Sequence, residues 1–353
     1  MRRPLITAAL LGAACTAGQG ETMGSLSGGG GSSTTSGSTT SSSSTTADPE
    51  LTTADATTSL GTTTTPTGDP TTDTDRMDLA RDPDLGLFPG PPPWCSTRKV
   101  DFVFQISSSP NVEPYQDNLL QSFGGWIDTI EELFPDFDVH VLVSNTWGSW
   151  GNNSKCFCLE DLGCDAIDEP NYPCWAAPGD KCDNTRAAGI VLPAGKGASN
   201  KLCGIPDGRR YLISGDPKLK ETFGCLAQGG YSNGSSQSEA MMEIVKPYIS
   251  APGACNAGFL RYDSLLFITI VEEGDDGSWS YNPTSWAEAV HYWREDPETL
   301  FVLGVLSDYP TDLEEFLGYI EHHHQLDIGE PNYVQGFTDA IEMALKLCEP
   351  PPK

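Results

Sequence analysis

The sequence predicts an α/β fold: a doubly wound, mostly parallel sheet flanked by helices, in which one connection carries a disulfide-rich insertion. Four nearly continuous apolar runs, rich in β-branched residues, are typical of strands buried on both faces of a parallel sheet. These runs span residues 100–106, 138–144, 265–271 and 300–306. Apolar residues recur at helical spacing in two stretches, 115–134 and 332–347. Because strands alternate with helices along the chain, we expect a parallel sheet with right-handed crossovers.

Three pairs of residues predict further helix starts. In each pair a hydroxyl can cap the first turn while a Glu three residues later reaches back, the pattern called a capping box. The pairs are Ser236 with Glu239, Ser285 with Glu288, and Thr311 with Glu314. The third helix is expected to span residues 311–323, which places the run His322-His323-His324 at its C-terminus. Consecutive residues of a helix do not share a face, so this run is not expected to hold a metal.

Residues 147–215 break the alternation of strands and helices. They hold six Cys, many Gly and Asn residues, and little hydrophobic periodicity. We interpret this segment as a disulfide-stapled insertion in one connection. Two short stretches, Ala188–Leu192 and Tyr211–Ser214, are candidate strands, either within the insertion or in the main sheet.

Cysteine usage predicts a cross-linked domain. The chain has 11 Cys, and setting Cys15 aside leaves ten, an even number that predicts up to five disulfides in an exported protein. The candidates are Cys95, Cys156, Cys158, Cys164, Cys174, Cys182, Cys203, Cys225, Cys255 and Cys348. A bond between Cys95 and Cys348 would close a very long loop and stabilise the fold by roughly 5 kcal/mol in the chain-entropy model. The close spacing of Cys156, Cys158 and Cys164 also suggests zinc, but the sequence lacks the paired C-x-x-C units of zinc sites.

The N-terminal segment predicts export. Arg2 and Arg3 precede a short apolar stretch, residues 4–14, which is too short to cross a bilayer and is typical of a signal peptide. Gly12-Ala13-Ala14-Cys15 then resembles a bacterial lipoprotein signal, which implies a signal peptide over residues 1–15 and a lipid on Cys15. Ordinary secretion, with Cys15 removed along with the leader, is the alternative. We expect a protein of the outer membrane or cell surface, held there by its lipid.

Composition separates a tether from a domain. Residues 16–93 are rich in Ser, Thr, Gly and Pro, a composition that buries no core and predicts a disordered linker. Residues 94–353 are long enough for one core and form the predicted domain. They hold 39 acidic and 16 basic residues, a net charge of −23. This charge disfavours nucleic acid as a partner, although it attracts divalent cations in a general way.

Polar residues follow each of the four predicted strands. In chain order they are Gln105, Ser107 and Ser109; Ser144, Asn145 and Thr146; Glu272, Glu273, Asp275 and Asp276; and Ser307 and Asp308. Because the carboxyl ends of parallel strands lie along one edge of the sheet, we expect these side chains to gather there. Hydroxyl and carboxylate oxygens are ligands that Mg²⁺ and Ca²⁺ prefer, although Ser and Asp also commonly begin helices and turns.

Two of these stretches resemble the von Willebrand factor A (VWA) family, in the form found in myxobacterial and δ-proteobacterial lipoproteins. The family's metal-ion-dependent adhesion site uses an Asp-x-Ser-x-Ser loop, which falls here on Gln105-Ile106-Ser107-Ser108-Ser109. Residues 256–276 resemble the bacterial pattern of an Asn-x-Gly-Phe-x-Arg segment, a strand and an acidic cluster. The resemblance covers about residues 98–348 and implies a VWA fold with a binding or adhesion role.

The family's metal ligands are altered in this chain. Gln105 stands where the motif has its first Asp, and Glu272 stands where the family has a later Asp. The family's Thr falls near residues 229–234, where Ser232 is the nearest hydroxyl. Because fewer fixed negative ligands bind divalent cations more weakly, we predict a degenerate site. Any Ca²⁺ or Mg²⁺ would be held weakly, by the acidic cluster after Glu272, and no cofactor is required.

Two other functions were weighed against binding. Residues 230–234 match the Gly-x-Ser-x-Gly pattern of serine hydrolases, but no strand-like run precedes them, as that nucleophile turn requires. A hydrolase that uses Ser232 with a His residue is therefore an alternative, and so is a structural envelope protein without a ligand.

Aromatic residues in loops and helix starts could form a recognition patch or pack against disulfides. They are Trp147, Trp150, Trp175, Trp279, Trp286 and Trp293.

The sequence as a whole favours a binding module over an enzyme. We expect a monomeric domain on a flexible tether that recognises a protein or surface ligand near the cell envelope. Its contact face would comprise the strand ends and residues 147–215.

Overall fold

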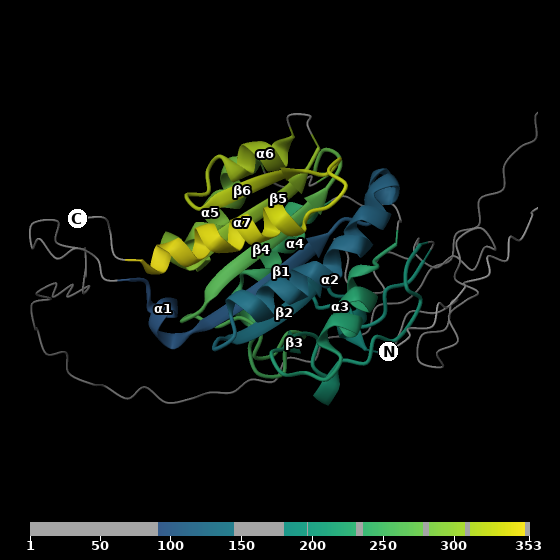
Figure 1. Ribbon diagram of the computed structural model, residues 1–353, viewed down its shortest axis with the longest axis horizontal. Helices are drawn as coiled ribbons and strands as arrows, with labels where there is room; N and C mark the ends of the chain where they lie inside the picture. The colour runs from purple at the N-terminus through teal and green to yellow at the C-terminus, as the bar shows by residue number, and fades with distance from the viewer. Residues whose placement is uncertain are drawn as a thin grey trace, which may run out of the picture. The chain divides into compact units, whose positions relative to one another are not determined.

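The computed structural model describes residues 91–144, 180–195, 197–230, 236–277, 282–307 and 311–349. All of them belong to one of the chain's two compact units, Leu79–Lys353. They form a six-stranded sheet in the order β3-β2-β1-β4-β5-β6, with helices on both faces (Figure 1). The strand order runs outward from β1 in one direction and from β4 in the other. This doubly wound order confirms the predicted α/β class.

The four central strands confirm the four predicted runs. They are β1 (Lys99–Ile106), β2 (Asp138–Ser144), β4 (Leu265–Glu272) and β5 (Leu300–Leu306), and all their pairings with one another are parallel. β4 and β5 are buried over their whole length, as expected of parallel strands covered on both faces. The sequence signal was strong here because neither face of these strands needs polar residues.

One edge of the sheet is formed by the end of the predicted insertion. β3 (Leu212–Ile213) lies within the expected stretch and pairs antiparallel with β2. The expected strand at Ala188–Leu192 is wrong, because the described backbone there forms bends instead. The amide of Ile190 still donates to the carbonyl of Val143 at 2.9 Å, so this segment runs beside the end of β2. Residues 145–179 of the insertion lie outside the described part of the chain.

The other edge corrects the expectation for the histidine run. α6 (Asp312–Leu317) ends well before it, and β6 (His323–Asp327) takes the place of the predicted helix end. β6 pairs parallel with β5, and His323 lies opposite Val302. An edge strand needs only its main chain for this pairing, so its sequence carries no apolar run. His323 and His324 lie in this strand and His322 directly precedes it, so the run does not end a helix.

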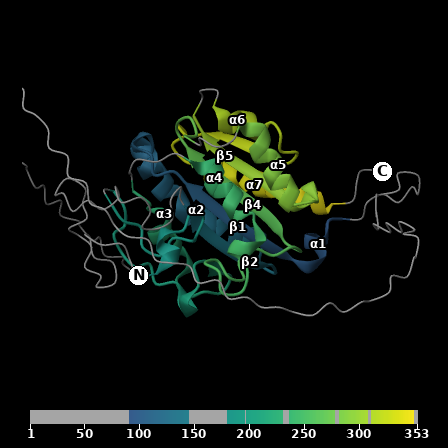
Figure 2. The ribbon, with the colours of Figure 1, turned by 180° about the vertical axis from the view of Figure 1, so that it is seen from behind.

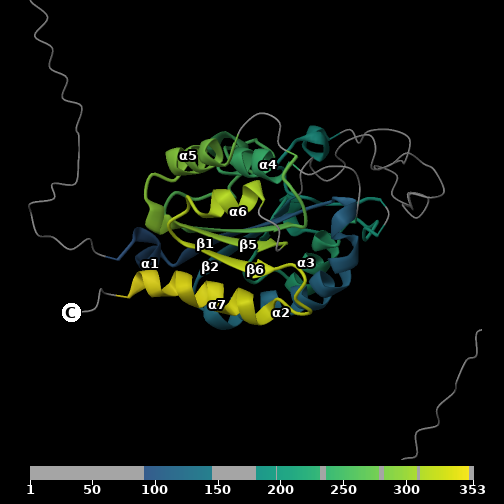
Figure 3. The same cartoon turned by 90° about the horizontal axis from the view of Figure 1, so that it is seen from above.

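Helices cover both faces of the sheet (Figure 3). On one face lie α2 (Gln116–Leu133), α3 (Leu219–Ala227) and α7 (Val334–Leu345). On the other lie α4 (Gln237–Ile244), α5 (Pro283–Trp293) and α6, and Figure 2 shows this side of the molecule. Each layer has its own apolar cluster: Phe104 packs with Trp126 on the first face, and Val103 belongs to the cluster of the second. Successive β1 residues therefore face opposite layers.

The remaining short elements are turns around this frame. α1 (Pro93–Thr97) precedes β1. Six 3₁₀ turns are described: Pro110–Tyr115, Lys181–Asn184, Pro206–Gly208, Pro247–Ile249, Pro297–Thr299 and Lys346–Cys348. Within the described ranges, none of the helices has the length and apolar character needed to span a membrane.

The helix starts confirm one predicted hydroxyl cap and correct two. The side chain of Thr311 accepts from the amide of Glu314 at 3.2 Å, as predicted. The helix expected to start at Ser285 starts one turn earlier, because Asn282 caps it and accepts from the amide of Ser285. Ser236 precedes α4 but makes no cap hydrogen bond with its side chain. An acidic residue from a distant loop replaces it, as described below.

Three disulfides connect six of the ten candidate cysteines. Cys95 pairs with Cys348, as proposed from their positions, and joins the two ends of the domain. Cys182 pairs with Cys255, and Cys203 pairs with Cys225. Both of these bonds join the insertion to later segments of the domain. Cys156, Cys158, Cys164 and Cys174 lie outside the described residues, as does Cys15.

Candidate functional site

The strand order places a switch point between β1 and β4, where the two halves of the sheet diverge. Ligands of doubly wound sheets bind at the carboxyl ends of the strands beside such a point. β1 ends at Ile106 and is followed by the predicted serines, and β4 ends at Glu272. Gln105 pairs with Ile270 and follows Val103 by two residues, so its side chain points to the face covered by α4. The predicted strand-end residues of β1 and β4 therefore do share one edge.

Glu272 is the central carboxylate of this edge. It is 1% exposed, and it accepts hydrogen bonds from the hydroxyl of Ser107 and from the amide of Glu273. The side-chain amide of Gln237, the first residue of α4, lies 3.5 Å from its Oε2 atom. Burial outweighs these hydrogen bonds and raises the pKa of Glu272 to about 7. Sequence reasoning missed Gln237, because its role depends on where α4 begins in space.

Asp276 holds the loop after β4 against the start of α4. Its two carboxylate oxygens accept from the amides of Gln237 and Ser238, each at 2.9 Å. Asp276 is 5% exposed, so this is a buried, charge-assisted cap of a helix N-terminus. The hydroxyl of Ser236 turns away and donates to the carbonyl of Gly277. Asp276 therefore does the capping that the sequence pattern assigned to Ser236.

The other predicted site residues have separate surroundings. Ser109 caps the turn after β1, since its hydroxyl accepts from the amide of Asn111 at 3.3 Å. Ser107 accepts from the amide of Ser109 and so shapes the same loop. Asp275 is exposed to solvent. Ser232 lies outside the described residues.

Several buried polar atoms at this edge have no hydrogen-bond partner within the described part of the chain. Gln105 is fully buried, and both atoms of its amide, Nε2 and Oε1, are unpartnered. The same holds for Oε1 of Gln237 and for the hydroxyls of Ser238 and Ser307. Such orphaned groups are rare in folded proteins and costly, and several of them lie at the carboxyl ends of the strands of this sheet.

The donor set suits a divalent cation poorly. Within the described ranges, no three His, Cys, Asp or Glu side chains come together as metal ligands would. Both oxygens of Asp276 hold backbone amides, and Gln105 offers a neutral amide in place of a carboxylate. Glu272 is the other buried carboxylate at this edge, and its raised pKa leaves it partly protonated near neutral pH. The degenerate site predicted from the sequence remains a prediction, and these observations support it.

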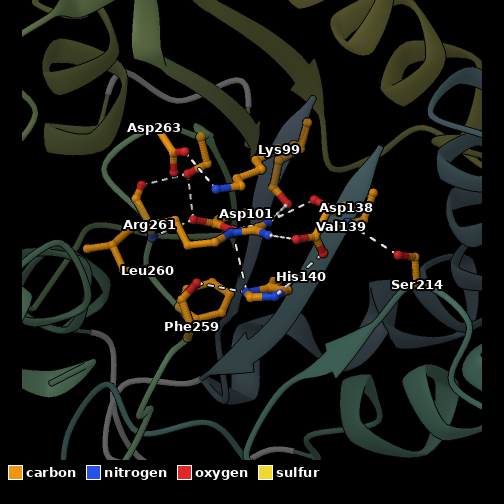
Figure 4. A network of polar contacts seen from close by, with 12 residues as sticks. Lys99, Asp101, Asp138, Val139, His140, Ser214, Phe259, Leu260, Arg261 and Asp263 are labelled. Atoms are coloured by element: carbon orange, nitrogen blue, oxygen red, sulfur yellow. Dashed lines mark hydrogen bonds and ion pairs between the residues drawn. The ribbon is translucent and has the colours of Figure 1, made fainter. Parts of the chain in front are cut away.

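The Asn-x-Gly-Phe-x-Arg segment lies at the other end of the strands, where β1 begins, and contacts that strand. Figure 4 shows Arg261 clamped onto Asp101 of β1. The Arg261 Nε and main-chain amide each donate to one Asp101 oxygen at 2.8 Å, and Ser264 adds a third hydrogen bond at 2.6 Å. Asp101 is fully buried, so this clamp compensates its charge.

Two other residues of that segment, Asn256 and Phe259, hold the insertion and β2 in place. The side chain of Asn256, fully buried, bonds to Gly189 and Ala187 of the insertion. The carbonyl of Phe259 lies 2.9 Å from Nδ1 of His140 in β2 (Figure 4). Burial lowers the pKa of His140 and so favours its uncharged imidazole. The residues that carry the family resemblance in this segment therefore stabilise the fold.

The aromatic residues divide between core and surface. Trp286 is fully buried against the second face of the sheet, whereas Trp293 at the end of α5 lines a surface hollow. Trp147, Trp150, Trp175 and Trp279 lie outside the described residues. Sequence reasoning could not separate packing from recognition; the structure shows that Trp286 packs in the core, and a recognition role for Trp293 stays a prediction.

Comparison with known proteins adds two distant structural likenesses. No protein-family model matches the chain, and no curated protein matches it either. A von Willebrand factor type A protein from Catenulispora acidiphila is similar at 12% identity, with a TM-score of 0.38 over 71% of this chain and 43% of that one. The human COPII-coat protein Sec24c is similar at 8% identity, with a TM-score of 0.31 over 74% of this chain and 33% of that one. This chain thus spans less than half the length of either.

The chain's own strand order and site define the class. It is a doubly wound α/β domain, cross-linked by disulfides, with a buried polar cluster at the switch point of its sheet.

Proposed function

We propose that this chain is an exported, lipid-anchored binding module of the VWA type. It recognises a protein or another surface component near the cell envelope and catalyses no reaction. The domain works as a monomer carried on a tether of residues 16–93. The contact face comprises the strand ends and the insertion.

The unpartnered amide of Gln105 carries this proposal. An amide that is fully buried, with neither atom bonded, lowers stability unless something else completes its hydrogen bonds. It lies at the edge where sheets of this class bind ligands. The proposed ligand supplies groups that reach this edge and bond to Gln105 and its neighbours Gln237 and Ser307.

Recognition in this proposal needs no divalent cation. The metal site that the family resemblance implies is predicted to be degenerate here. Neutral amides and hydroxyls dominate the described cluster, so the ligand would be held by direct hydrogen bonds.

The test is a comparison of two variants that both remove an orphaned polar group. Gln105→Met changes the proposed site. Thr269→Val removes an unpartnered, fully buried hydroxyl from β4 on the opposite face. Immobilised full chain and both variants are exposed to cell-surface extracts, and retained components are identified by mass spectrometry. A component retained by the wild type and Thr269→Val, but lost by Gln105→Met, supports the proposal; equal retention by all three contradicts it.

The hydrolase alternative makes a different prediction. α3 (Leu219–Ala227), a helix, precedes the Gly-x-Ser-x-Gly run, where a nucleophile turn needs a strand. We therefore expect no hydrolysis of generic ester or peptide substrates. Activity that disappears in Ser232→Ala would overturn the binding proposal in favour of the enzyme.

The lipid anchor is tested separately. In Cys15→Ala the proposed acyl attachment is lost, so the protein should move from the membrane to the soluble fraction of fractionated cells. Unchanged membrane retention would contradict lipidation and leave the binding proposal to its own test.

A further inference from the structure

A groove separates α4 from α5 on the face away from α2 and α7. From α5 it is lined by Ser285, Glu288, Ala289 and Tyr292, which follow the spacing of one helix face. From α4 and the turn after it, Glu239, Met242, Glu243 and Lys246 repeat that spacing. The groove encloses about 550 Å³, enough for one or two large side chains of a partner.

A second hollow continues the groove past Tyr292. Tyr292 lines both, and Tyr262 and Trp293 line the second, which has a volume of about 440 Å³. Tyr292 is 71% exposed and Tyr262 is 72% exposed, so neither ring is needed to fill the core. Together these surfaces, called here the α5 groove, present aromatic faces along an accessible channel.

The charges of the α5 groove are unbalanced. Arg186 is paired with Glu239, and Lys246 is paired with Glu243 at 2.5 Å. Arg294 is 3% exposed and donates to main-chain carbonyls. The cations of the groove are thus already engaged.

Two carboxylates are left over. Glu288 and Glu295 are exposed, and neither forms a hydrogen bond or ion pair with another described residue. Glu288 stands one turn before Tyr292 on α5, so a free carboxylate and an exposed ring lie on the same helix face. A carboxylate beside an aromatic face is complementary to a guanidinium or ammonium group.

We propose that the α5 groove binds a segment of another protein that presents arginine or lysine side chains. The cation lies between the ring of Tyr292 and the carboxylate of Glu288, and a second cation reaches Glu295. A second copy of this chain is a poor occupant, because two domains of net charge −23 repel one another. This surface is separate from the strand-end cluster, so the two proposals stand or fall independently.

The experiment titrates an acetylated, amidated hexa-arginine peptide into the full chain by calorimetry at low salt. Glu288→Gln with Glu295→Gln should weaken binding roughly five- to ten-fold, since charge-assisted hydrogen bonds are lost. The matched control is Glu131→Gln with Glu342→Gln, which makes the same charge change on exposed positions of α2 and α7. That control should change the affinity less than about two-fold, because only the long-range field is altered.

The aromatic ring is tested by a second pair of variants. Tyr292→Ala should weaken binding roughly two- to five-fold, and Tyr292→Phe should restore it, because the ring face supplies the contact. Unchanged thermal midpoints would show that the exposed substitutions leave the fold intact.

Three results would overturn the proposal. The first is no measurable peptide binding. The second is equal weakening by both glutamine pairs, which would make the binding a general effect of net charge. The third is Tyr292-dependent binding of an N-acetylglucosamine hexamer without binding of the peptide, which would make the groove a glycan site.

Discussion

Replacing Gln105 by Met should make the isolated protein more stable. The amide of Gln105 is fully buried and neither of its polar atoms is bonded, so folding strips it of water without compensation. Mutational data put the cost of such a group at roughly 1–3 kcal/mol. Met has a similar length and shape, and a volume-conserving swap costs less than about 1.5 kcal/mol. The net effect therefore lies between a loss of about 0.5 and a gain of about 3 kcal/mol, with a central value of about 1–2 kcal/mol.

The assay is urea unfolding of the full chain, supported by calorimetry. For a domain of this size, a gain of 1 kcal/mol raises the midpoint of thermal unfolding by about 2–4 °C. A gain of about 1–2 kcal/mol in Gln105→Met should therefore raise that midpoint by roughly 2–8 °C. Thr269→Val should also stabilise, since it removes another unpartnered buried hydroxyl. If Gln105→Met instead lowers stability by more than about 1 kcal/mol, the amide has partners in the free protein, and the case for a prepared ligand site fails.

Three further predictions follow from the polar contacts. Arg261→Ala leaves the buried carboxylate of Asp101 without its cation and should lower the free energy of unfolding by about 3–5 kcal/mol. Urea unfolding measures this loss, and a loss below about 1 kcal/mol would show that the ion pair does not stabilise the fold. Glu272 ionises near pH 4.5 when unfolded and at about 7 when folded, so the native state holds the extra proton between these values. The free energy of unfolding should therefore fall by roughly 3 kcal/mol as the pH rises through this window, and this fall should be smaller in Glu272→Gln. If the wild type and the variant show the same dependence of unfolding free energy on pH, the raised pKa is contradicted. Calorimetry with Ca²⁺ and Mg²⁺ should detect no micromolar binding, whereas tight binding would refute the degenerate site.

The central sheet was predictable because its strands are buried on both sides. β4 and β5 consist almost entirely of apolar residues, and such short unbroken runs, rich in β-branched residues and bounded by polar turns, are typical of strands buried on both faces. β6 was missed for the opposite reason. The sequence His323-His324-Gln325-Leu326-Asp327 lies at the edge, where main-chain pairing with β5 suffices.

Helix caps were only partly predictable, because one cap comes from elsewhere in the chain. Thr311 caps its own helix and was found from local spacing. Asp276 caps α4 from 38 residues beyond Ser238, and no local pattern can reveal that contact. Asn282 displaced Ser285 as the cap, because its side-chain oxygen accepts from the amide of Ser285 and the helix starts one turn earlier.

The candidate site was predictable as a position and not as chemistry. Parallel strands bring their carboxyl ends together, so the edge that holds Gln105, Ser107 and Glu272 followed from the strand order. The proton affinity of Glu272 depends on how deeply α4 buries it, which the sequence does not state. The contribution of Gln237 depends on the same packing.

Amide hydrogen exchange on the bound domain tests the recognition face most directly. The component captured by the wild-type chain is added to it, and exchange is compared with and without that component. Binding at the switch point predicts new protection at residues 105–109 and 236–238, and around Glu272. Protection confined to other parts of the chain, with these residues unchanged, would contradict the assignment of this edge as the binding site.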